Sequence, residues 1–240
     1  MIKQLSTYLI LAFALLLTVS SCFSDGNPND DPDIQKYIGE SVDEVIDLDS
    51  ISSLPGFDAG YENTDRLAWQ KPDKLIELFG NLSNKTVADI GTGDGFFALK
   101  LAEKAQKVLA IDIDETSIAA LKNRIIKELT EDKQSKIETR LVSPNDPKLK
   151  PNELDAAIIS NTYMYIQNRT QYLSILKKGM KPGSQLMIID FKKKEIPFGP
   201  PQLIRVPLYQ VEKELRAAGF SKVTSMDMVL DYQYVVIAQP

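Results

Sequence analysis

The chain of 240 residues contains no histidine and a single cysteine, Cys22. The absence of histidine excludes a Ser-His-Asp triad and removes the side chain most often used for acid–base catalysis near neutral pH. Together with the lone cysteine it also excludes a zinc site made of cysteine and histidine, and no metal site is expected. One cysteine cannot form an intramolecular disulfide. A general base in this protein would therefore be an aspartate, a glutamate, a tyrosine, a lysine or water.

Long apolar runs are also scarce. The amino terminus carries one of 11 residues, Leu9–Val19, after the positive Lys3. A membrane-spanning helix needs about 20 apolar residues, so this run is too short to span a bilayer and is typical of a secretory signal peptide. The tetrapeptide that closes it, Val19–Ser20–Ser21–Cys22, resembles a bacterial lipobox. In a lipobox the cysteine is acylated and becomes the first mature residue, and the acyl chains hold the protein on a membrane.

We therefore predict a lipoprotein signal peptide over residues 1–22, lipidation of Cys22, and a protein anchored to a membrane of the cell envelope on its periplasmic or surface side. The alternative is an ordinary signal peptide followed by a chance cysteine. Ten acidic residues precede residue 61, against the two bases Lys3 and Lys36, whereas residues 61–240 carry 23 acids and 26 bases. Residues 23–60 are therefore predicted to be an acidic, flexible tether, with a possible short helix from Ile34 to Ile46.

From residue 61 onward the sequence alternates between apolar strands and amphipathic helices. This alternation predicts a parallel sheet covered on both faces. A helix from Asn63 to Phe79 should break near Pro72, and Ser143–Glu153 should cross over without a long helix. The expected strands are 86–90, 107–111, 137–142, 155–160, 185–190, 222–229 and 232–238, and the further helices are 95–104, 115–129, 168–179 and 208–218.

The chemistry is concentrated in a glycine loop and a carboxylate. Gly91, Gly93 and Gly95 follow an apolar strand, and Asp112 ends the next apolar strand. Glycines let a backbone turn tightly against a flat ligand, and a carboxylate at the neighbouring strand tip can accept both hydroxyls of a ribose. The pattern therefore predicts a nucleoside-containing cofactor. A dinucleotide fingerprint would need a glycine where Phe96 stands, which disfavours an NAD-type oxidoreductase.

The spacing Asp89-x-Gly-x-Gly-x-Gly resembles motif I of the class I S-adenosylmethionine-dependent methyltransferases. Further segments resemble that family in the same order, namely Ala110–Asp114, Leu154–Tyr163, Leu176–Gly183 and Gln185–Asp190. Trp69–Asp73 and Asp190–Pro201 are similar to a poorly characterised bacterial subgroup of it. The resemblance covers residues 61–240. It implies a Rossmann-like, doubly wound α/β fold whose seven-stranded sheet is mostly parallel with an antiparallel edge strand, and S-adenosylmethionine as the cofactor.

The resemblance also implies roles for individual residues. Ser143 stands where many relatives have an aspartate that contacts the adenine amino group, and a hydroxyl accepts that bond less strongly. The remaining implied contacts are Gly91, Gly93 and Gly95 along the amino-acid portion and sugar, Asp89 near the ammonium, Asp112 on the ribose hydroxyls, Ile113 on the adenine, and Asn161 with Thr162 near the sulfonium.

Two candidate bases follow the fourth and fifth strands. Tyr163, with Tyr165 beside it, is placed to reach the methyl acceptor, or else both are lid aromatics over the cofactor. Asp190 could be a base or a carboxylate that caps a loop. Trp69 could cover the cofactor or anchor its helix by burial. The lysines at 177, 178, 181 and 192–194 could form a basic patch, but a solvated helix end is commoner, so no nucleic-acid partner is expected.

Two functional hypotheses remain. The first is methyl transfer from S-adenosylmethionine to a small-molecule or lipid-like acceptor by a monomeric, membrane-tethered lipoprotein. The second is a non-catalytic lipoprotein binding module that retains the methyltransferase fold, because export would separate the protein from the cytoplasm in which this cofactor is made.

Overall fold

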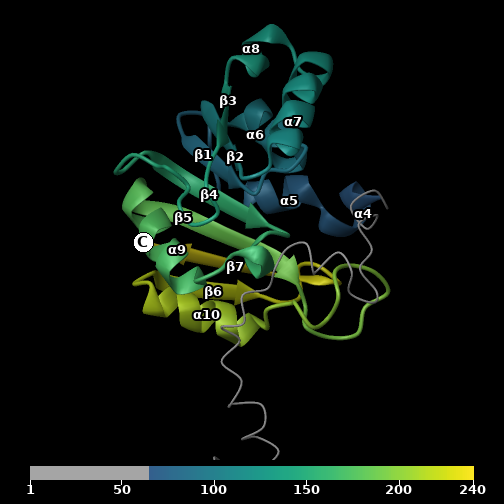
Figure 1. Cartoon of the computed structure of the whole chain (residues 1–240), viewed down its shortest axis with the longest axis vertical. Helices are drawn as coiled ribbons and strands as arrows, with labels where there is room; N and C mark the ends of the chain where they lie inside the picture. Colours follow the sequence, from purple (N-terminus) through teal and green to yellow (C-terminus); the bar gives the residue numbers. More distant parts are fainter. Residues whose placement is uncertain (1–64) are drawn as a thin grey trace, which may run out of the picture. The chain divides into compact units, whose positions relative to one another are not determined.

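The computed structural model describes residues 65–240, so the signal peptide, Cys22, the acidic tether and its possible helix lie outside the described residues. The described region contains a seven-stranded sheet with the strand order β3-β2-β1-β4-β5-β7-β6. β1 (Thr86–Ile90), β2 (Lys107–Asp112), β3 (Ile137–Leu141), β4 (Leu154–Ser160) and β5 (Met180–Phe191) are parallel. β7 (Gln233–Gln239) runs antiparallel to both β5 and β6 (Ser221–Met226). The predicted fold class is confirmed (Figure 1).

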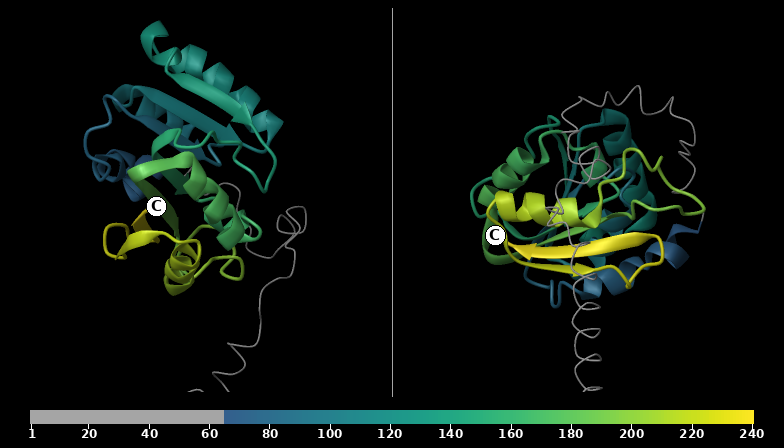
Figure 2. Two further views of the ribbon diagram at one scale, coloured as in Figure 1. Left: turned by 90° about the vertical axis from the view of Figure 1, so that its left-hand side faces the viewer. Right: turned by 90° about the horizontal axis from the view of Figure 1, so that it is seen from below.

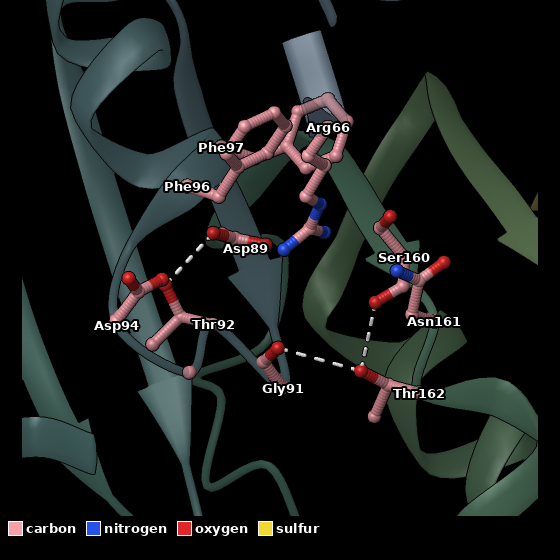
Figure 3. Close-up of a pocket in the computed structure, with 11 residues that line it drawn as sticks. Arg66, Asp89, Gly91, Thr92, Asp94, Phe96, Phe97, Ser160, Asn161 and Thr162 are labelled. Atoms are coloured by element: carbon pink, nitrogen blue, oxygen red, sulfur yellow. Dashed lines mark hydrogen bonds between the residues drawn. The ribbon is translucent and has the colours of Figure 1, made fainter. Parts of the chain in front are cut away.

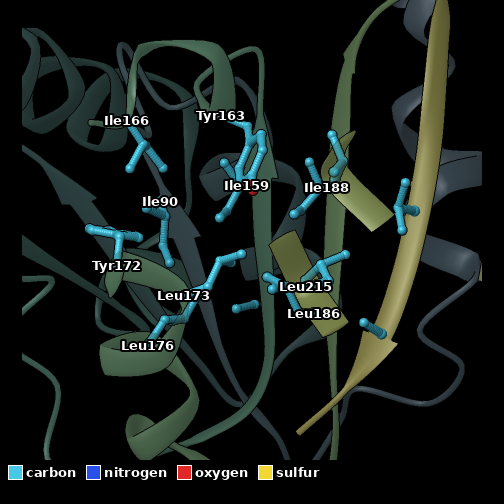
Figure 4. Close-up of a cluster of buried hydrophobic side chains, with 14 of the residues drawn as sticks. Ile90, Ile159, Tyr163, Ile166, Tyr172, Leu173, Leu176, Leu186, Ile188 and Leu215 are labelled. Atoms are coloured by element: carbon cyan, nitrogen blue, oxygen red, sulfur yellow. The ribbon is translucent and has the colours of Figure 1, made fainter. Parts of the chain in front are cut away.

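Helices cover both faces of this sheet, because successive strand residues point to opposite sides. Ile90 and Ile111 pack on one side with α9 (Arg169–Gly179) and α10 (Leu208–Ala217), as Figure 4 shows for α9. Val87 and Val108 pack on the other side with α5 (Pro72–Glu77), α6 (Phe96–Lys104) and α7 (Glu115–Glu128). The strands are therefore apolar on both faces, as the sequence pattern indicates. The views in Figure 2 show the two helical layers.

The predicted interruption before Pro72 is confirmed. α4 (Arg66–Gln70) ends at Lys71, whose left-handed φ of 49° turns the chain, and α5 begins at Pro72. Proline is well placed at the first position of a helix, because its missing N–H would be unpaired there in any case. The break lets the chain change direction between α4 and α5. Residues 63 and 64 of the predicted helix lie outside the described residues.

The structure differs from the predicted elements in three places. β5 begins at Met180, and a register shift opposite Leu154 and Ala156 accommodates the Lys181–Pro182–Gly183 turn within the strand. β6 ends at Met226 rather than at 229. Short helices α8 (Glu131–Gln134) and η2 (Tyr163–Tyr165) were not predicted, since one helical turn is too short to show a periodic pattern. The crossover between β3 and β4 has no helix, as predicted.

Among residues 65–240, no helix is long and apolar enough to cross a membrane.

Candidate functional site

A pocket opens at the carboxyl ends of β1 and β4, where the strand order reverses direction. From β1 the chain proceeds through β2 to β3 on one side, and it returns to β4 on the other. Open α/β sheets bind ligands at such a switch point. The pocket is lined by Arg66, Asp89, Gly91, Thr92, Gly93, Asp94, Phe96, Phe97, Ser160, Asn161 and Thr162 (Figure 3). Of the predicted cofactor residues, the structure brings Asp89, Gly91, Gly93, Asn161 and Thr162 together here.

The three glycines of the loop have three different surroundings, although each has a positive φ. A Cβ on Gly91 would lie 2.3 Å from the Thr162 side chain, so this glycine lets the loops after β1 and β4 meet. A Cβ on Gly93 would meet no described atom within 4 Å, which leaves its face of the loop open. A Cβ on Gly95 would lie 2.2 Å from Leu121 of α7. Gly95 is therefore required for helix packing, and it does not line the pocket as the resemblance implies.

Asp89 of β1 lines the pocket and is almost fully buried, with 2% of its surface exposed. One carboxylate oxygen accepts a hydrogen bond of 2.7 Å from the Thr92 hydroxyl. Burial raises the pKa of Asp89 to about 6, although the Thr92 hydrogen bond and the positive charge of Arg66 act in the opposite direction. A cation in the pocket would favour the ionised form of this carboxyl group. The geometry is therefore compatible with the predicted contact to an ammonium group.

Asp112 lies at the tip of β2, beside the pocket rather than in its lining. Its carboxylate accepts three backbone hydrogen bonds, from Gly93 at 2.7 Å, from Ile113 at 2.7 Å and from Asp114 at 3.0 Å. These bonds tie the glycine loop to the end of the neighbouring strand. An ionised carboxylate has about four acceptor positions, so one remains for a ribose hydroxyl. Ile113 next to it is 44% exposed and offers an apolar surface at the position predicted for adenine.

Ser143 lies exposed on the loop after β3, where it forms a bridge with Asp146. Asp112 at the end of β2 pairs with Leu141 at the end of the adjacent strand β3. Ser143 therefore lies two residues beyond the tip of β3. The structure does not bring Ser143 into the pocket. Its predicted contact to the adenine amino group remains a prediction.

Tyr163 and Asp190, the two candidate bases, lie behind the pocket. Tyr163 is fully buried in the core, and its hydroxyl donates a hydrogen bond of 2.5 Å to Glu214. Burial, together with the charge of Glu214, raises the pKa of Tyr163 well above its ordinary value. The tyrosine therefore connects η2 to α10, and the geometry supports neither a base nor a lid over the cofactor.

The Asp190 carboxylate accepts hydrogen bonds from the backbone N–H groups of Met164 at 3.1 Å and Phe191 at 2.8 Å. Its side chain is buried, with 1% of the residue surface exposed, and burial raises its pKa to about 7. These contacts match the alternative given above for Asp190, a carboxylate that caps the loop after β4. Trp69 likewise is buried, and its ring packs 5.7 Å from Phe191 and 5.3 Å from Phe198, which makes it an anchor for α4.

Sequence reasoning missed the polar lining residues Thr92, Asp94 and Ser160, and also a polar network that begins at Arg66. Arg66 lies over the Phe96 ring at 4.0 Å and donates a hydrogen bond of 2.6 Å to Gln70. Gln70 in turn donates to Gln233 at 3.0 Å. Gln70 and Gln233 are fully buried, although glutamine is mostly an exposed residue type. Gln70 lies in the Trp69–Asp73 segment of the resemblance, but its contact with Gln233 could not be predicted, because the two lie 163 positions apart.

Known proteins identify the class to which this domain belongs. The family described as "Methyltransferase domain" matches residues 81–229, more than half of the chain, and the chain belongs to that family. An S-adenosylmethionine-dependent methyltransferase from Aquifex aeolicus shares 29% sequence identity and a TM-score of 0.67, over 80% of this chain and 97% of that one. The chain therefore contains an S-adenosylmethionine-dependent methyltransferase domain.

Two further relatives are more distant. Phosphoethanolamine N-methyltransferase 2 from Haemonchus contortus, in complex with phosphomonomethylethanolamine and S-adenosylhomocysteine, shares the fold with a TM-score of 0.59 at 16% identity, over 71% of this chain and 52% of that one. An uncharacterized RNA methyltransferase from Clostridium acetobutylicum is 28% identical over 142 residues, or 53% of this chain. That match spans only 30% of the curated relative's length.

The residues at the pocket fit S-adenosylmethionine. Gly93 leaves an open cradle, and Asp112 keeps an acceptor position beside the exposed Ile113. Asp89 offers a negative charge to the cofactor's ammonium group, while Asn161 and Arg66 offer hydrogen-bond donors to the same pocket. Among residues 65–240, no cluster of side chains could hold a metal ion.

Proposed function

We propose that this protein is a membrane-tethered lipoprotein that transfers a methyl group from S-adenosylmethionine to a small-molecule or lipid-like acceptor. The observation that carries the proposal is the assembly of Asp89, the Gly91–Gly93 loop and Asn161–Thr162 around one pocket at the switch point of the sheet. Bound there, S-adenosylmethionine supplies an activated methyl group on a sulfonium centre. The protein has to align the acceptor with that methyl group and keep water out.

The chain's own residues would perform the binding. Asp112 fixes the glycine loop through Gly93 and leaves one acceptor position for the ribose. Thr162 joins the two sides of the site, because its hydroxyl contacts the carbonyl oxygens of Gly91 at 3.3 Å and Ser160 at 3.0 Å. With Tyr163 and Asp190 engaged in structural hydrogen bonds, the geometry favours catalysis by alignment over catalysis by a dedicated base.

A nucleic-acid substrate has weaker support. The RNA methyltransferase from Clostridium matches over less than a third of its own length, so its substrate does not transfer to this chain. Two of the lysines considered for a basic patch are already engaged. Lys192 is buried and donates to the Leu230 carbonyl at 3.0 Å, and Lys181 pairs with Asp155 at 2.8 Å. We accordingly expect no nucleic-acid partner. We also expect the protein to be a monomer.

The deciding experiment is calorimetric titration of S-adenosylmethionine and S-adenosylhomocysteine into the full chain and into Asp112→Ala. We expect micromolar binding to the wild-type protein and a loss of at least about tenfold in the variant. Asp132→Ala, which changes an exposed aspartate of α8 outside the pocket, is the control. Absence of binding at millimolar ligand in a folded sample would favour the non-catalytic binding module.

A further inference from the structure

Asn161 has an amide nitrogen without a hydrogen-bond partner. Among the residues that the structure describes, Nδ2 of Asn161 is the buried side-chain nitrogen or oxygen atom for which no partner is found. The residue is 5% exposed, yet it lines the pocket, and Figure 3 shows the amide nitrogen turned toward the side on which Arg66 lies. A buried donor without an acceptor is destabilising, which points to a ligand that supplies the acceptor.

The orientation of this amide is fixed by its neighbours. Oδ1 of Asn161 accepts hydrogen bonds from Nε2 of Gln233 at 2.5 Å and from Nε2 of Gln70 at 3.4 Å. Turning the amide over would place its NH₂ group against these two donors, so the network itself assigns oxygen and nitrogen. The backbone of Asn161 is held as well. Its φ is left-handed at 57°, and its N–H donates a hydrogen bond of 2.9 Å to the Ile189 carbonyl. Asn161 therefore presents a donor, and not an acceptor, to the pocket.

Arg66 belongs to the same network and adds a positive charge. Its Nε donates to Oε1 of Gln70 at 2.6 Å, and Gln70 donates to Oε1 of Gln233 at 3.0 Å. Four residues from three elements, α4, β7 and the loop after β4, are thus joined through buried amides. A guanidinium and an amide NH₂ have hydrogens to donate and no lone pair to offer an amine. Both can bind an acceptor oxygen, and the positive charge of the guanidinium favours an anionic one, a carboxylate above all.

We propose that Asn161 and Arg66 form a carboxylate subsite that binds the amino-acid carboxylate of the cofactor, with Gln70 and Gln233 as its positioning residues. Asp89 in the same pocket is then left for the ammonium group of the same amino acid. A negative and a positive side chain lining one pocket are complementary to a zwitterion. The inference rests on the proposed function, because it assigns one end of that cofactor.

The test compares two ligands that differ by this carboxylate alone. S-adenosylhomocysteine and its decarboxylated analogue are titrated calorimetrically into the full chain, Asn161→Asp and Arg66→Gln. Asn161→Asp places a carboxylate against the ligand's carboxylate. We expect it to weaken S-adenosylhomocysteine at least about tenfold and to leave the decarboxylated analogue within about threefold. Arg66→Gln, on a different element, should lower the same ratio of affinities.

The matched control is Asn152→Asp, which makes the same change at an exposed residue that also has a left-handed φ, 54°. It should affect neither ligand. Equal weakening of both ligands by Asn161→Asp and by Arg66→Gln, or no weakening of either, would overturn the carboxylate subsite while leaving cofactor binding intact. If the wild-type protein binds neither ligand, the proposed function itself fails, and the subsite falls with it.

Discussion

Asp190 shows how one buried carboxyl group makes stability depend on pH. Its pKa is raised from 3.8 to about 7 by burial, so the folded protein favours the protonated form over most of the range between these values. A group whose pKa is raised on folding adds stability that is fully present below its unfolded pKa. That stability is lost as the pH rises through the folded pKa, which for Asp190 gives a window from about pH 4 to pH 7.

We therefore predict that Asp190→Asn changes the pH profile of stability. The difference in unfolding free energy between wild type and variant should shift by roughly 3–4 kcal/mol across that window, in the direction that favours wild type at acid pH. Urea unfolding at intervals from pH 4 to pH 8 measures it. Asp155→Asn should give a trend of opposite sign. Burial opposes ionisation of Asp155, but hydrogen bonds from Lys181 and from the Thr86 N–H, together with the Lys181 charge, hold the pKa of its carboxyl group below the ordinary value. Parallel profiles for wild type and Asp190→Asn would contradict the prediction.

The glycines provide a second test at this scale. Alanine at either Gly93 or Gly95 pays about 1–2 kcal/mol for its positive φ. At Gly95 the Cβ would also lie 2.2 Å from Leu121, whereas at Gly93 it meets no described atom within 4 Å. Overpacking adds about 1–3 kcal/mol, so Gly95→Ala should unfold more easily than Gly93→Ala by that amount.

Gly93→Ala should in turn weaken S-adenosylhomocysteine more than Gly95→Ala does, because Gly93 lines the pocket and Gly95 does not. Urea unfolding measures which of the two variants is less stable, and calorimetry measures which binds S-adenosylhomocysteine less tightly. The double variant Gly95→Ala with Leu121→Ala should recover part of the overpacking cost. Equal stabilities for the two single variants would show that α7 shifts to admit the extra methyl group.

At the scale of elements, Tyr163 and Glu214 hold η2 and α9 against α10. Glu214 accepts hydrogen bonds from Tyr163 at 2.5 Å and from Arg169 at 2.9 Å. Burial opposes ionisation of Glu214, but these hydrogen bonds hold the pKa of its carboxyl group below the ordinary value. A buried ion pair with an extra donor fixes the relative position of the elements that supply it.

We predict that Tyr163→Phe separates a structural role from a catalytic one. The ring stays in the core, and the lost hydroxyl leaves Glu214 with one donor fewer, at a cost of about 1–3 kcal/mol in unfolding free energy. Affinity for S-adenosylhomocysteine should stay within about threefold of wild type. Tyr209→Phe, on an exposed ring of α10, is the control. A variant as stable as wild type that has lost all methyl transfer would restore the tyrosine as a catalytic residue.

Much of the fold could be predicted from the sequence because its signals are local. The apolar strands, the break at Pro72 and the glycine loop each occupy a few consecutive residues. The polar network behind the pocket could not be predicted, since Gln70 and Gln233 meet across 163 positions and only the antiparallel return of β7 brings them together. The burial of Tyr163 was missed for the same reason, because its partner Glu214 lies 51 positions away.

At the scale of the whole molecule, the proposed tether would decide where the protein meets its methyl acceptor. Residues 1–64 lie outside the described residues, and their charge is read from the sequence. The excess of acids before residue 61 and the slight excess of bases after it separate the chain into two electrostatic parts. Each buried CH₂ group of an acyl chain contributes about 0.8 kcal/mol, so more than one chain on Cys22 would hold the domain firmly at a bilayer. A domain held there would sample the proposed lipid-like acceptors at a high local concentration.

We predict that Cys22→Ala abolishes acylation in a bacterial host that processes lipoproteins. The wild-type chain should take up radiolabelled palmitate and sediment with membranes, and the variant should take up no label. Label is the deciding readout, because an uncleaved signal peptide can keep the variant at a membrane without acylation. Ser24→Ala, two residues further along, should behave as wild type. Label on the Cys22→Ala chain would place the lipid elsewhere, and the absence of label on wild type would leave an ordinary signal peptide followed by a chance cysteine.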